Sequence, residues 1–504
     1  MVKKAVANDE TDKLLDDALL VIEKDKEIVS LTEELTRLRE SYDNLNKAYT
    51  NIVTSKSWKI TKPIRMVCKV CVKLKKELYS KKDKKQSILF LVQDWVYVDN
   101  KNMTNIGGTA LHVIDIINQI KEEKNCYVLT IIDKKYVLVT FDGDSQLIYD
   151  LNVKMKTEFF DKYDSEFSNM IDLLIDNLQI DLVHIHHIMR FPCDIKDISK
   201  KVKTIHTIHD YTLLCPRNFL VNTENEFCTN GSKKDCRLCL KEHQIDFSVR
   251  NDAVKQLIEN VDANIVPDES IIKELDHYYS IANYEIIPHG IDTKQIVPFT
   301  MSNKKLGQKI NIAFVGLMVP HKGLNVARDL VFNNNRTNII YHLFGTSSDE
   351  RLNMNQKNYV YHGLYNKTEL PKLLNDNKID LVLLLSTCPE SYSYVLSEVA
   401  YAKVPAMSFD IGALANRIKK DKIGWVIDAH EDVDYKNVIH AYNKALKKES
   451  YNEVIENLKQ YKDVDVKDMI DKTVAIYDKM YVKKNKKYYL IQEFIEKYPL
   501  TYKL

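Results

Sequence analysis

Short apolar runs alternate with helical stretches along most of the chain, and this alternation constrains the fold more than any other feature. In the first half, the expected strands are residues 88–92, 127–132, 182–185, 203–208, 263–266 and 285–287. In the second half, they are residues 310–315, 338–344, 359–361, 380–385 and 404–409. Strands that alternate with helices form parallel sheets covered on both faces. We therefore expect an α/β protein with two Rossmann-like domains that face a cleft.

The 504 residues are enough for several domains, each with its own core. The expected segments are a coiled-coil helix (1–54), a basic amphipathic linker (55–85), an amino-terminal Rossmann-like domain (86–292), a linker (293–308), a carboxyl-terminal Rossmann-like domain (309–470) and a helical tail (471–504).

The first segment carries a heptad pattern. Apolar residues recur at alternating spacings of three and four, at Ile28, Leu31, Leu35, Leu38, Tyr42, Leu45, Tyr49 and Ile52. Such a seam predicts a short coiled coil, and so a homo-oligomer assembled through residues 28–52. The alternative is one amphipathic helix folded against its own chain.

Residues 55–85 concentrate positive charge, with twelve Lys and Arg against Glu77 and Asp83. Apolar side chains such as Trp58 and Ile60 interleave with these bases. This composition is typical of a helix that lies on an anionic membrane surface. The alternative is a solvated basic linker.

The composition of the whole chain is that of an ordinary soluble protein, and its formal net charge is only +2. No global field therefore points to nucleic acid as a partner. The chain has no apolar stretch of about 18 residues or more, and residues 1–10 lack the apolar core of a signal peptide. We expect a cytoplasmic protein, with the basic segment as its contact with the inner face of the membrane.

Two glutamates, Glu390 and Glu398, follow the apolar run 381–385 and lie eight residues apart. If residues 391–402 form the expected helix, the spacing corresponds to a rise of about 12 Å. Glycoside hydrolases place their two carboxylates roughly 5 to 9.5 Å apart to flank one bond. The pair is therefore better suited to hold two ends of one extended ligand.

Both halves of the chain also contain a glycine-bearing junction between a strand and a helix. In the second half, Gly316 is followed by Lys322-Gly323 and a helical stretch, and in the first half Gly107-Gly108 precede one. Exposed backbone N–H groups and a lysine at a helix start form a generic anion cradle.

Together, these motifs resemble the family-4 retaining glycosyltransferases of the GT-B fold, of the bacterial cell-surface polysaccharide type. The family's E-x7-E motif matches Glu390 and Glu398, its lysine-glycine pair matches Lys322-Gly323, and its amino-terminal glycine loop matches Gly107-Gly108. Further matches are His209-Asp210 and the interdomain segment 287–292. The similarity covers roughly residues 86–470.

The resemblance implies transfer of a glycosyl unit from a nucleotide-diphosphate sugar to a hydroxyl of a glycan or lipid-linked acceptor, with retention and without a cofactor for catalysis. It implies Glu390, His209 and Asp210 as the catalytic residues. The donor-binding residues that it implies are Gly107, Gly108, Gly316, Lys322, Gly323, Ser393, Tyr394 and Glu398. In GT-B enzymes the last helix often crosses back to the first domain, and residues 488–498 are the candidate.

One position departs from the family pattern. Many members have Arg directly after the first glycine of the carboxyl-terminal domain, and this chain has Leu317. Part of the charge that neutralises the diphosphate must then come from elsewhere. The departure supports one alternative, a non-catalytic GT-B scaffold that assembles other transferases through its coiled coil.

Four cysteines, Cys215, Cys228, Cys236 and Cys239, lie in a polar insertion at residues 215–243. Four thiolates on a long loop suit a structural Zn²⁺ ion, which would supply folding energy that the loop lacks. Unpaired thiols, or other ligation with His243, are the alternatives.

Two further patterns invite a metal and are interpreted otherwise. The first half is rich in histidines, at His112, His184, His186, His187, His206 and His209. For His184 and His186 we favour hydrogen-bonded or substrate-facing roles over a metal site. For His209 we favour a role in the donor site. The triplet Asp142-Gly143-Asp144 would fit a metal-dependent GT-A transferase, but similar Asp pairs recur by chance in this Asp-rich chain.

Overall fold

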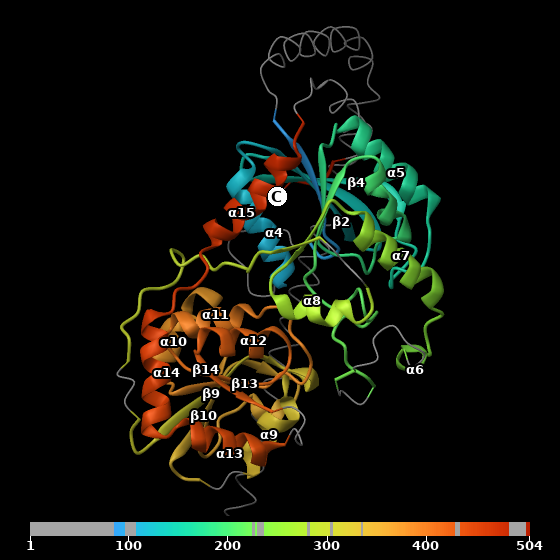
Figure 1. Ribbon diagram of the computed structural model, residues 1–504. Helices are drawn as coiled ribbons and strands as arrows, with labels where there is room; N and C mark the ends of the chain where they lie inside the picture. Colours follow the sequence, from blue (N-terminus) through green and yellow to red (C-terminus); the bar gives the residue numbers. More distant parts are fainter. Residues whose placement is uncertain are drawn as a thin grey trace, which may run out of the picture. The chain divides into compact units, whose positions relative to one another are not determined.

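The computed structural model describes residues 85–95, 107–223, 227–228, 236–279, 283–302, 306–333, 336–428, 434–482 and 500–503. These residues form two sheets, each covered by helices (Figure 1). The predicted coiled-coil seam and nearly all of the basic segment 55–85 lie outside the described residues.

The first domain is built on a sheet that has nine strands among the described residues, in the order β15-β4-β3-β2-β1-β5-β6-β7-β8. Its strands are β1 (Ser87–Leu91), β2 (Asn125–Ile132), β3 (Lys135–Asp142), β4 (Ser145–Lys154), β5 (Leu182–Ile185), β6 (Lys203–Thr207), β7 (Ala263–Val266), β8 (Tyr284–Ile286) and β15 (Leu500–Lys503). From β2 through β8 the neighbours are parallel, as predicted.

Both faces of this sheet are buried, which explains the continuous apolar run in β1. Leu89 and Leu91 pack into one core, whereas Ile88 and Phe90 pack into the core on the opposite face. Successive side chains of a strand point to opposite faces, so a strand covered on both sides needs apolar residues throughout.

The edge of this sheet differs from the prediction. Strands β3 and β4 form an antiparallel hairpin against β2, and β15 pairs antiparallel with β4. The hairpin turns at Gly143, whose φ is 59°, and an Asp-Gly pair is a common hairpin signal. Asp144 lies at the tip, 93% exposed, and its carboxylate pairs with Lys121 Nζ at 2.7 Å. The Asp-x-Asp triplet is thus a surface turn.

The second domain is built on a parallel sheet with six strands among the described residues, in the order β11-β10-β9-β12-β13-β14. They are β9 (Ile310–Met318), β10 (Ile339–Ser347), β11 (Tyr359–Gly363), β12 (Leu381–Leu384), β13 (Ala406–Phe409) and β14 (Gly424–Ile427). Apolar cores lie on both of its faces.

The α-helices among the described residues are α4 (Gly108–Ile120), α5 (Ser165–Asn177), α6 (Cys236–Cys239), α7 (Phe247–Asn260), α8 (Glu269–Asp276), α9 (Leu324–Asn333), α10 (Leu370–Asp376), α11 (Tyr394–Tyr401), α12 (Gly412–Asp421), α13 (Tyr435–Ala445), α14 (Lys448–Gln460) and α15 (Val466–Met480). Short 3-10 helices include η2 (Cys193–Lys200), η3 (Pro320–Lys322), η4 (Glu350–Leu352) and η5 (Lys367–Glu369). Among the described helices, none is long and apolar enough to cross a membrane.

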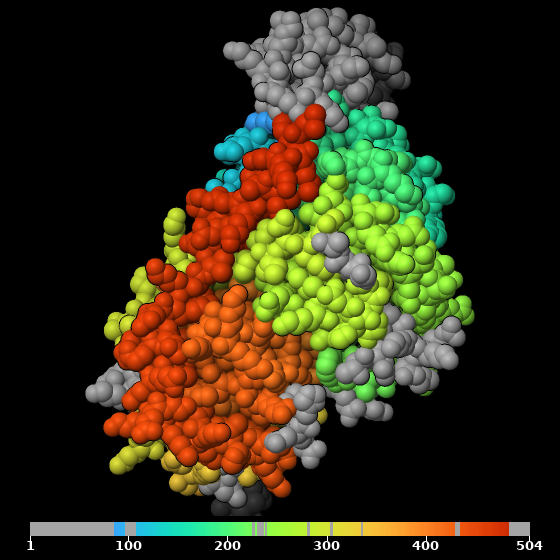
Figure 2. All heavy atoms as spheres, viewed as in Figure 1, coloured from blue at the N-terminus to red at the C-terminus, as the bar shows by residue number. Residues whose placement is uncertain are grey.

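The chain returns to the first domain through α15, which lies against α4 (Figure 1). Its Met469, Ile470 and Tyr477 are buried in a first-domain core. Figure 2 shows this segment, in red, running over one face from the second domain to the first. The expected boundary at residue 470 therefore falls inside a helix that belongs to the first domain's core. Residues 488–498, expected to make this crossing, lie outside the described residues.

Candidate functional site

A cleft of about 790 Å³ lies between the two domains. Its walls come from the start of α4 and the segments after β6 and β8 on one side, and from the ends of β9, β10 and β12 on the other. Open α/β sheets bind ligands at the carboxyl ends of their strands, and pockets of about 300 to 1,000 Å³ accommodate small molecules. The cleft has the position and size of a substrate site.

Most of the predicted site residues line this cleft. They are Gly108, His209, Asp210, Gly316, Lys322, Glu390, Ser393, Tyr394 and Glu398. The two other predicted glycines shape the backbone next to it. Gly107 is the residue before α4, and Gly323 adopts a φ of 80° with its Cα so near β12 that a Cβ would lie 2.2 Å from the Leu385 carbonyl oxygen.

The start of α4 offers free backbone donors to the cleft. Its N-cap is Gly107, which has no side chain to cap the helix, and the first turn contains no acidic residue. Other helices are capped by an Asp side chain, such as Asp164 for α5 and Asp268 for α8. The first N–H groups of α4 and the positive end of its dipole therefore remain available to an anion.

The segment that contains the E-x7-E motif corrects one prediction. Helix α11 begins at Tyr394 rather than at Ser391, and the expected rise of eight helical residues between Glu390 and Glu398 is therefore wrong. Ser393 has a φ of 74°, which breaks the helix, and its side chain caps α11 by accepting from Leu396 N. Glu390 lies in the loop before the helix, whereas Glu398 lies on it.

Arg417 holds this strained loop in place. Its Nη1 donates to the Tyr392 and Ser393 carbonyls at 2.9 Å each, and its Nη2 donates to Ser397 Oγ at 2.7 Å. The guanidinium also lies over the Tyr392 ring, 3.8 Å from its centroid. A non-glycine residue at positive φ costs about 1 to 3 kcal/mol, which these contacts offset. The sequence analysis did not identify this residue.

Glu390 is placed by two neighbours in the second domain. Ser386 Oγ donates to Glu390 Oε1 at 2.6 Å, and Lys322 Nζ lies 3.9 Å from the same oxygen. The Lys322 side chain is 45% exposed, and the Glu390 side chain is 22% exposed. The ion pair is long and open to the cleft, so both groups can exchange it for contacts with a ligand.

Glu398 is buried deeper, and its burial raises its pKa to about 8, although Lys367 acts in the opposite direction. Burial likewise raises the pKa of Asp115 on α4 to about 6, again opposed by Lys367. Asp115 and Lys367 both line the cleft. The sequence analysis missed these two residues, although a carboxylate among the buried residues of α4 is a signal.

The two domains touch across the cleft through aromatic rings. The His289 ring lies between the His209 ring, at 5.3 Å, and the Tyr394 ring, at 5.4 Å. Ser391 Oγ donates to the His209 carbonyl. Gly108 permits this approach, because a Cβ there would lie 3.3 Å from Tyr394 Cε2. The start of α4 is thereby brought against the start of α11.

Comparisons with known families cover both domains. Residues 106–295 match Glycosyltransferase Family 4, and residues 300–461 match Glycosyl transferases group 1. The chain is a family-4-like GT-B glycosyltransferase. A comparison with curated protein sequences finds no match.

Solved structures share the fold of this glycosyltransferase at low identity. Sucrose-phosphate synthase from Thermosynechococcus elongatus is 13% identical, with 79% of this chain and 99% of that chain covered and a TM-score of 0.55. WaaG, a glycosyltransferase involved in lipopolysaccharide biosynthesis, is 14% identical, with 77% and 99% covered and a TM-score of 0.51. Anabaena HepE in complex with UDP-glucose is 13% identical, with 78% and 99% covered and a TM-score of 0.50.

The glycosyltransferase lacks a cation at Leu317, whose side chain lines the cleft and is 51% exposed. Among the described residues that line the cleft, Lys322 and Lys367 are the lysine and arginine side chains. Lys367 is therefore the structure's candidate for the charge that the family arginine supplies elsewhere.

The cysteine insertion contributes to the cleft wall. Its Asn218 and Phe219 line the cleft, and the Phe219 ring stacks on His321 of η3 with centroids 4.6 Å apart. In the part of the chain that the structure describes, the four cysteines do not form a group with three metal-ligand atoms within 4.8 Å of one another. The structural zinc site stays a prediction.

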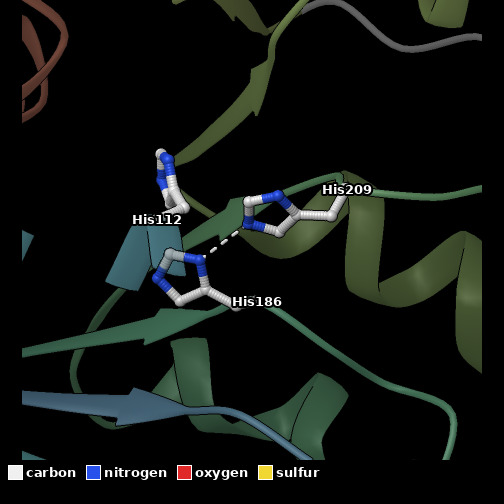
Figure 3. A group of neighbouring side chains, drawn as sticks. All are labelled: His112, His186 and His209. Carbon is white, nitrogen blue, oxygen red and sulfur yellow. Dashed lines mark hydrogen bonds between the residues drawn. The ribbon is translucent and has the colours of Figure 1, made fainter. Parts of the chain in front are cut away.

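Three histidines do form such a group: His112, His186 and His209 (Figure 3). His186 Nδ1 and His209 Nε2 are joined by a hydrogen bond of 2.9 Å. His184 is hydrogen-bonded as well, to Tyr477 Oη at 2.6 Å and to Thr207 Oγ1 at 2.7 Å. The expected hydrogen-bonded roles of His184 and His186 thus agree with the geometry, which also brings together a ligand set that the sequence analysis disfavoured.

Proposed function

We propose that the chain is a retaining glycosyltransferase that moves a hexosyl or related unit from a nucleotide-diphosphate sugar to an acceptor hydroxyl. The observation that carries this proposal is the placement of Lys322, the start of α4 and both glutamates of the E-x7-E motif on one cleft. We further propose that catalysis requires no metal, because the cleft offers its own positive groups to the leaving diphosphate.

The diphosphate would bind between the start of α4 and Lys322. The helix supplies unpaired backbone N–H groups and a positive dipole end, and the lysine supplies a charge that is only loosely paired with Glu390. Lys367 adds a second cation on the cleft wall. Stabilisation of the developing negative charge on the leaving group is the main catalytic demand in such a reaction.

The two glutamates would divide the sugar nucleotide between them. Glu390, partly exposed beside Lys322, would bind hydroxyls of the donor sugar, and the deeper Glu398 would bind the ribose. His209 and Asp210 line the opposite wall, where they would orient the sugar and the acceptor. Retention would then follow from departure of the diphosphate and attack of the acceptor on the same face.

The similar solved structures suggest which donor and acceptor to test first. HepE was solved with UDP-glucose, which supports a uridine-diphosphate hexose as the first donor to test. WaaG acts in lipopolysaccharide biosynthesis, which supports a surface glycan or lipid-linked acceptor in a bacterium. A cytoplasmic location at the membrane, through residues 55–85, and a homo-oligomer through residues 28–52 stay predictions.

A panel of nucleotide sugars tests the proposal, with thermal shift for binding and release of nucleoside diphosphate without acceptor for chemistry. We expect one donor to stabilise the protein and to be hydrolysed slowly. The exposed Leu317 favours the second candidate, a non-catalytic scaffold. A scaffold would hydrolyse no donor in the panel, which would overturn the proposed function.

A further inference from the structure

Three imidazole rings from separate elements meet beside the cleft that His209 lines (Figure 3). His112 lies on α4, His186 directly follows β5, and His209 follows β6. One nitrogen of each ring lies within 4.8 Å of the other two. His112 and His186 are only 3% and 2% exposed, and His209 lines the cleft.

Two nitrogens of this group are buried without a hydrogen-bond partner, namely His112 Nδ1 and His186 Nε2. Buried polar atoms are almost always paired, because an unpaired one loses its hydration without compensation. The fold therefore retains two costly atoms in one small cluster. An ion bound to His112 Nδ1 would remove the cost of that atom, whereas His186, which would bind through the Nδ1 that faces His209, would keep its Nε2 unpaired.

Burial favours the neutral form of all three rings. Burial lowers the pKa of His112 to about 3, and burial is also the main cause that lowers the pKa of His186 and of His209. Imidazole binds metals in its neutral form. The proton in the hydrogen bond between His186 Nδ1 and His209 Nε2 would have to move to the other nitrogen of its ring before both nitrogens could bind an ion.

We propose that His112, His186 and His209 form a binding site for a divalent transition-metal ion that prefers imidazole, such as Zn²⁺ or Co²⁺. Three protein ligands leave a fourth coordination position, as in exchangeable rather than structural zinc sites. Because His209 lines the cleft, the proposed site adjoins it.

The distances permit such a site after small ring rotations. Metal-to-nitrogen bonds of about 2.0 to 2.1 Å separate tetrahedral ligand nitrogens by roughly 3.3 Å. His186 Nδ1 and His209 Nε2 are slightly closer than this, at 2.9 Å, and the ligand nitrogens of the three rings all lie within 4.8 Å of one another. An ion would replace the hydrogen bond between two of the rings and draw the third ring inward.

This site would not supply a metal for catalysis. In a consequence that rests on the proposed function, a bound ion occupies His209, which is assigned to the donor site, and so it inhibits sugar transfer. Metal binding itself is measured without any assay of activity.

The test uses the full chain without an affinity tag, carrying Cys236→Ser and Cys239→Ser so that the predicted thiolate site does not compete. After treatment with EDTA and its removal, the protein is titrated with Co²⁺, followed by its visible absorption. We expect one Co²⁺ per chain, with the intense bands of tetrahedral nitrogen ligation, and displacement by Zn²⁺.

Single substitutions identify the ligands. His112→Gln and His186→Gln should each weaken Co²⁺ binding by at least about 100-fold, whereas His206→Gln should change it by less than about threefold. His206 is a matched control, because it is also buried with an unpaired Nδ1 but lies outside the group. Circular dichroism confirms that each variant is folded, and two separate ligand variants guard against one that is not.

The site is overturned if wild-type protein shows no saturable Co²⁺ binding, or if folded His112→Gln and His186→Gln bind as tightly as His206→Gln. If Zn²⁺ binds as expected and no sugar nucleotide is turned over, the proposed function fails while the metal site stands. If donor hydrolysis proceeds at the same rate with and without Zn²⁺ bound, the inhibitory consequence fails alone.

Discussion

The two walls of the cleft use different chemistry. The first-domain wall is built from the start of α4 and from imidazole rings such as His209 and His289, whose pKa values are lowered mainly by burial. The second-domain wall carries Lys322, Glu390 and Glu398. The second domain thus carries the lysines and the two glutamates of the E-x7-E motif, while the first domain presents imidazole rings, backbone donors and the carboxylates of Asp115 and Asp210.

This division allows the domains to meet closely. His289 stacks between His209 of the first domain and Tyr394 of the second, at centroid distances of 5.3 and 5.4 Å. Charged imidazoles at these distances would repel one another in a buried setting. Neutral rings avoid that cost, so the cleft can exclude water without bringing like charges together.

The largest effect should come from a change on the second-domain wall of the cleft, which carries Lys322, Glu390 and Glu398. Glu390→Gln keeps the size of the side chain and removes its charge, so it should lower turnover while the fold stays intact. The loss of a charged hydrogen bond to the sugar costs about 1.5 to 3 kcal/mol, which is more than about tenfold in rate. Steady-state kinetics measures it, with the exposed Glu453→Gln as control. Wild-type turnover in the Glu390 variant would remove this residue from the chemistry.

Lys322→Ala should weaken the binding of the nucleoside diphosphate and of the sugar nucleotide to the same extent, because the phosphates are common to both ligands. We expect about a tenfold loss of affinity for each, typical of one charge-assisted hydrogen bond. Isothermal titration measures both ligands, and Lys372→Ala, whose partner is Asp376, is the control. Equal affinities in wild type and variant would make Lys322 a structural residue.

Leu317→Arg tests the difference between the two walls in the opposite direction, because it adds a cation to the second-domain wall. The leucine side chain is 51% exposed on the cleft, so an arginine fits without displacing a core residue. Nucleoside diphosphate affinity should rise by about threefold to tenfold, as expected for a partly exposed ion pair. No gain in affinity, with the fold unchanged, would show that the diphosphate lies away from this position.

The smallest effect concerns Glu398. Its folded pKa of about 8 lies above the unfolded value, so its contribution to stability is fully present below about pH 4.5 and is lost as the pH rises through about 8. Glu398→Gln mimics the protonated carboxyl, so it should raise Tm by a few degrees at about pH 8.5 and leave it nearly unchanged at about pH 4. The same Tm difference at both pH values would mean that Glu398 is ionised when folded.

The sequence predicted the parts of the fold that depend on local pattern. Buried parallel strands are recognised in a sequence as short apolar runs. Strands β5 and β7 begin and end at the expected residues. The motif residues reached one cleft because parallel strands end at the same edge.

Other features depend on contacts between distant residues, which no local pattern shows. Ser393 takes a positive φ because Arg417, 24 residues further on, holds its carbonyl. The burial of Asp115 and Glu398, which raises their pKa values, depends on the meeting of two domains. The gathering of His112, His186 and His209 likewise requires α4, β5 and β6 to be in place.

The central claim is that the cleft's own groups, namely Lys322, the start of α4 and the two glutamates, drive a retaining transfer without a metal. Early-time NMR of the sugar released from an α-linked sugar nucleotide, with EDTA present and before the anomers equilibrate, tests it most directly. The account predicts release of the α anomer at an undiminished rate. Release of the β anomer, or loss of activity with EDTA, would contradict it.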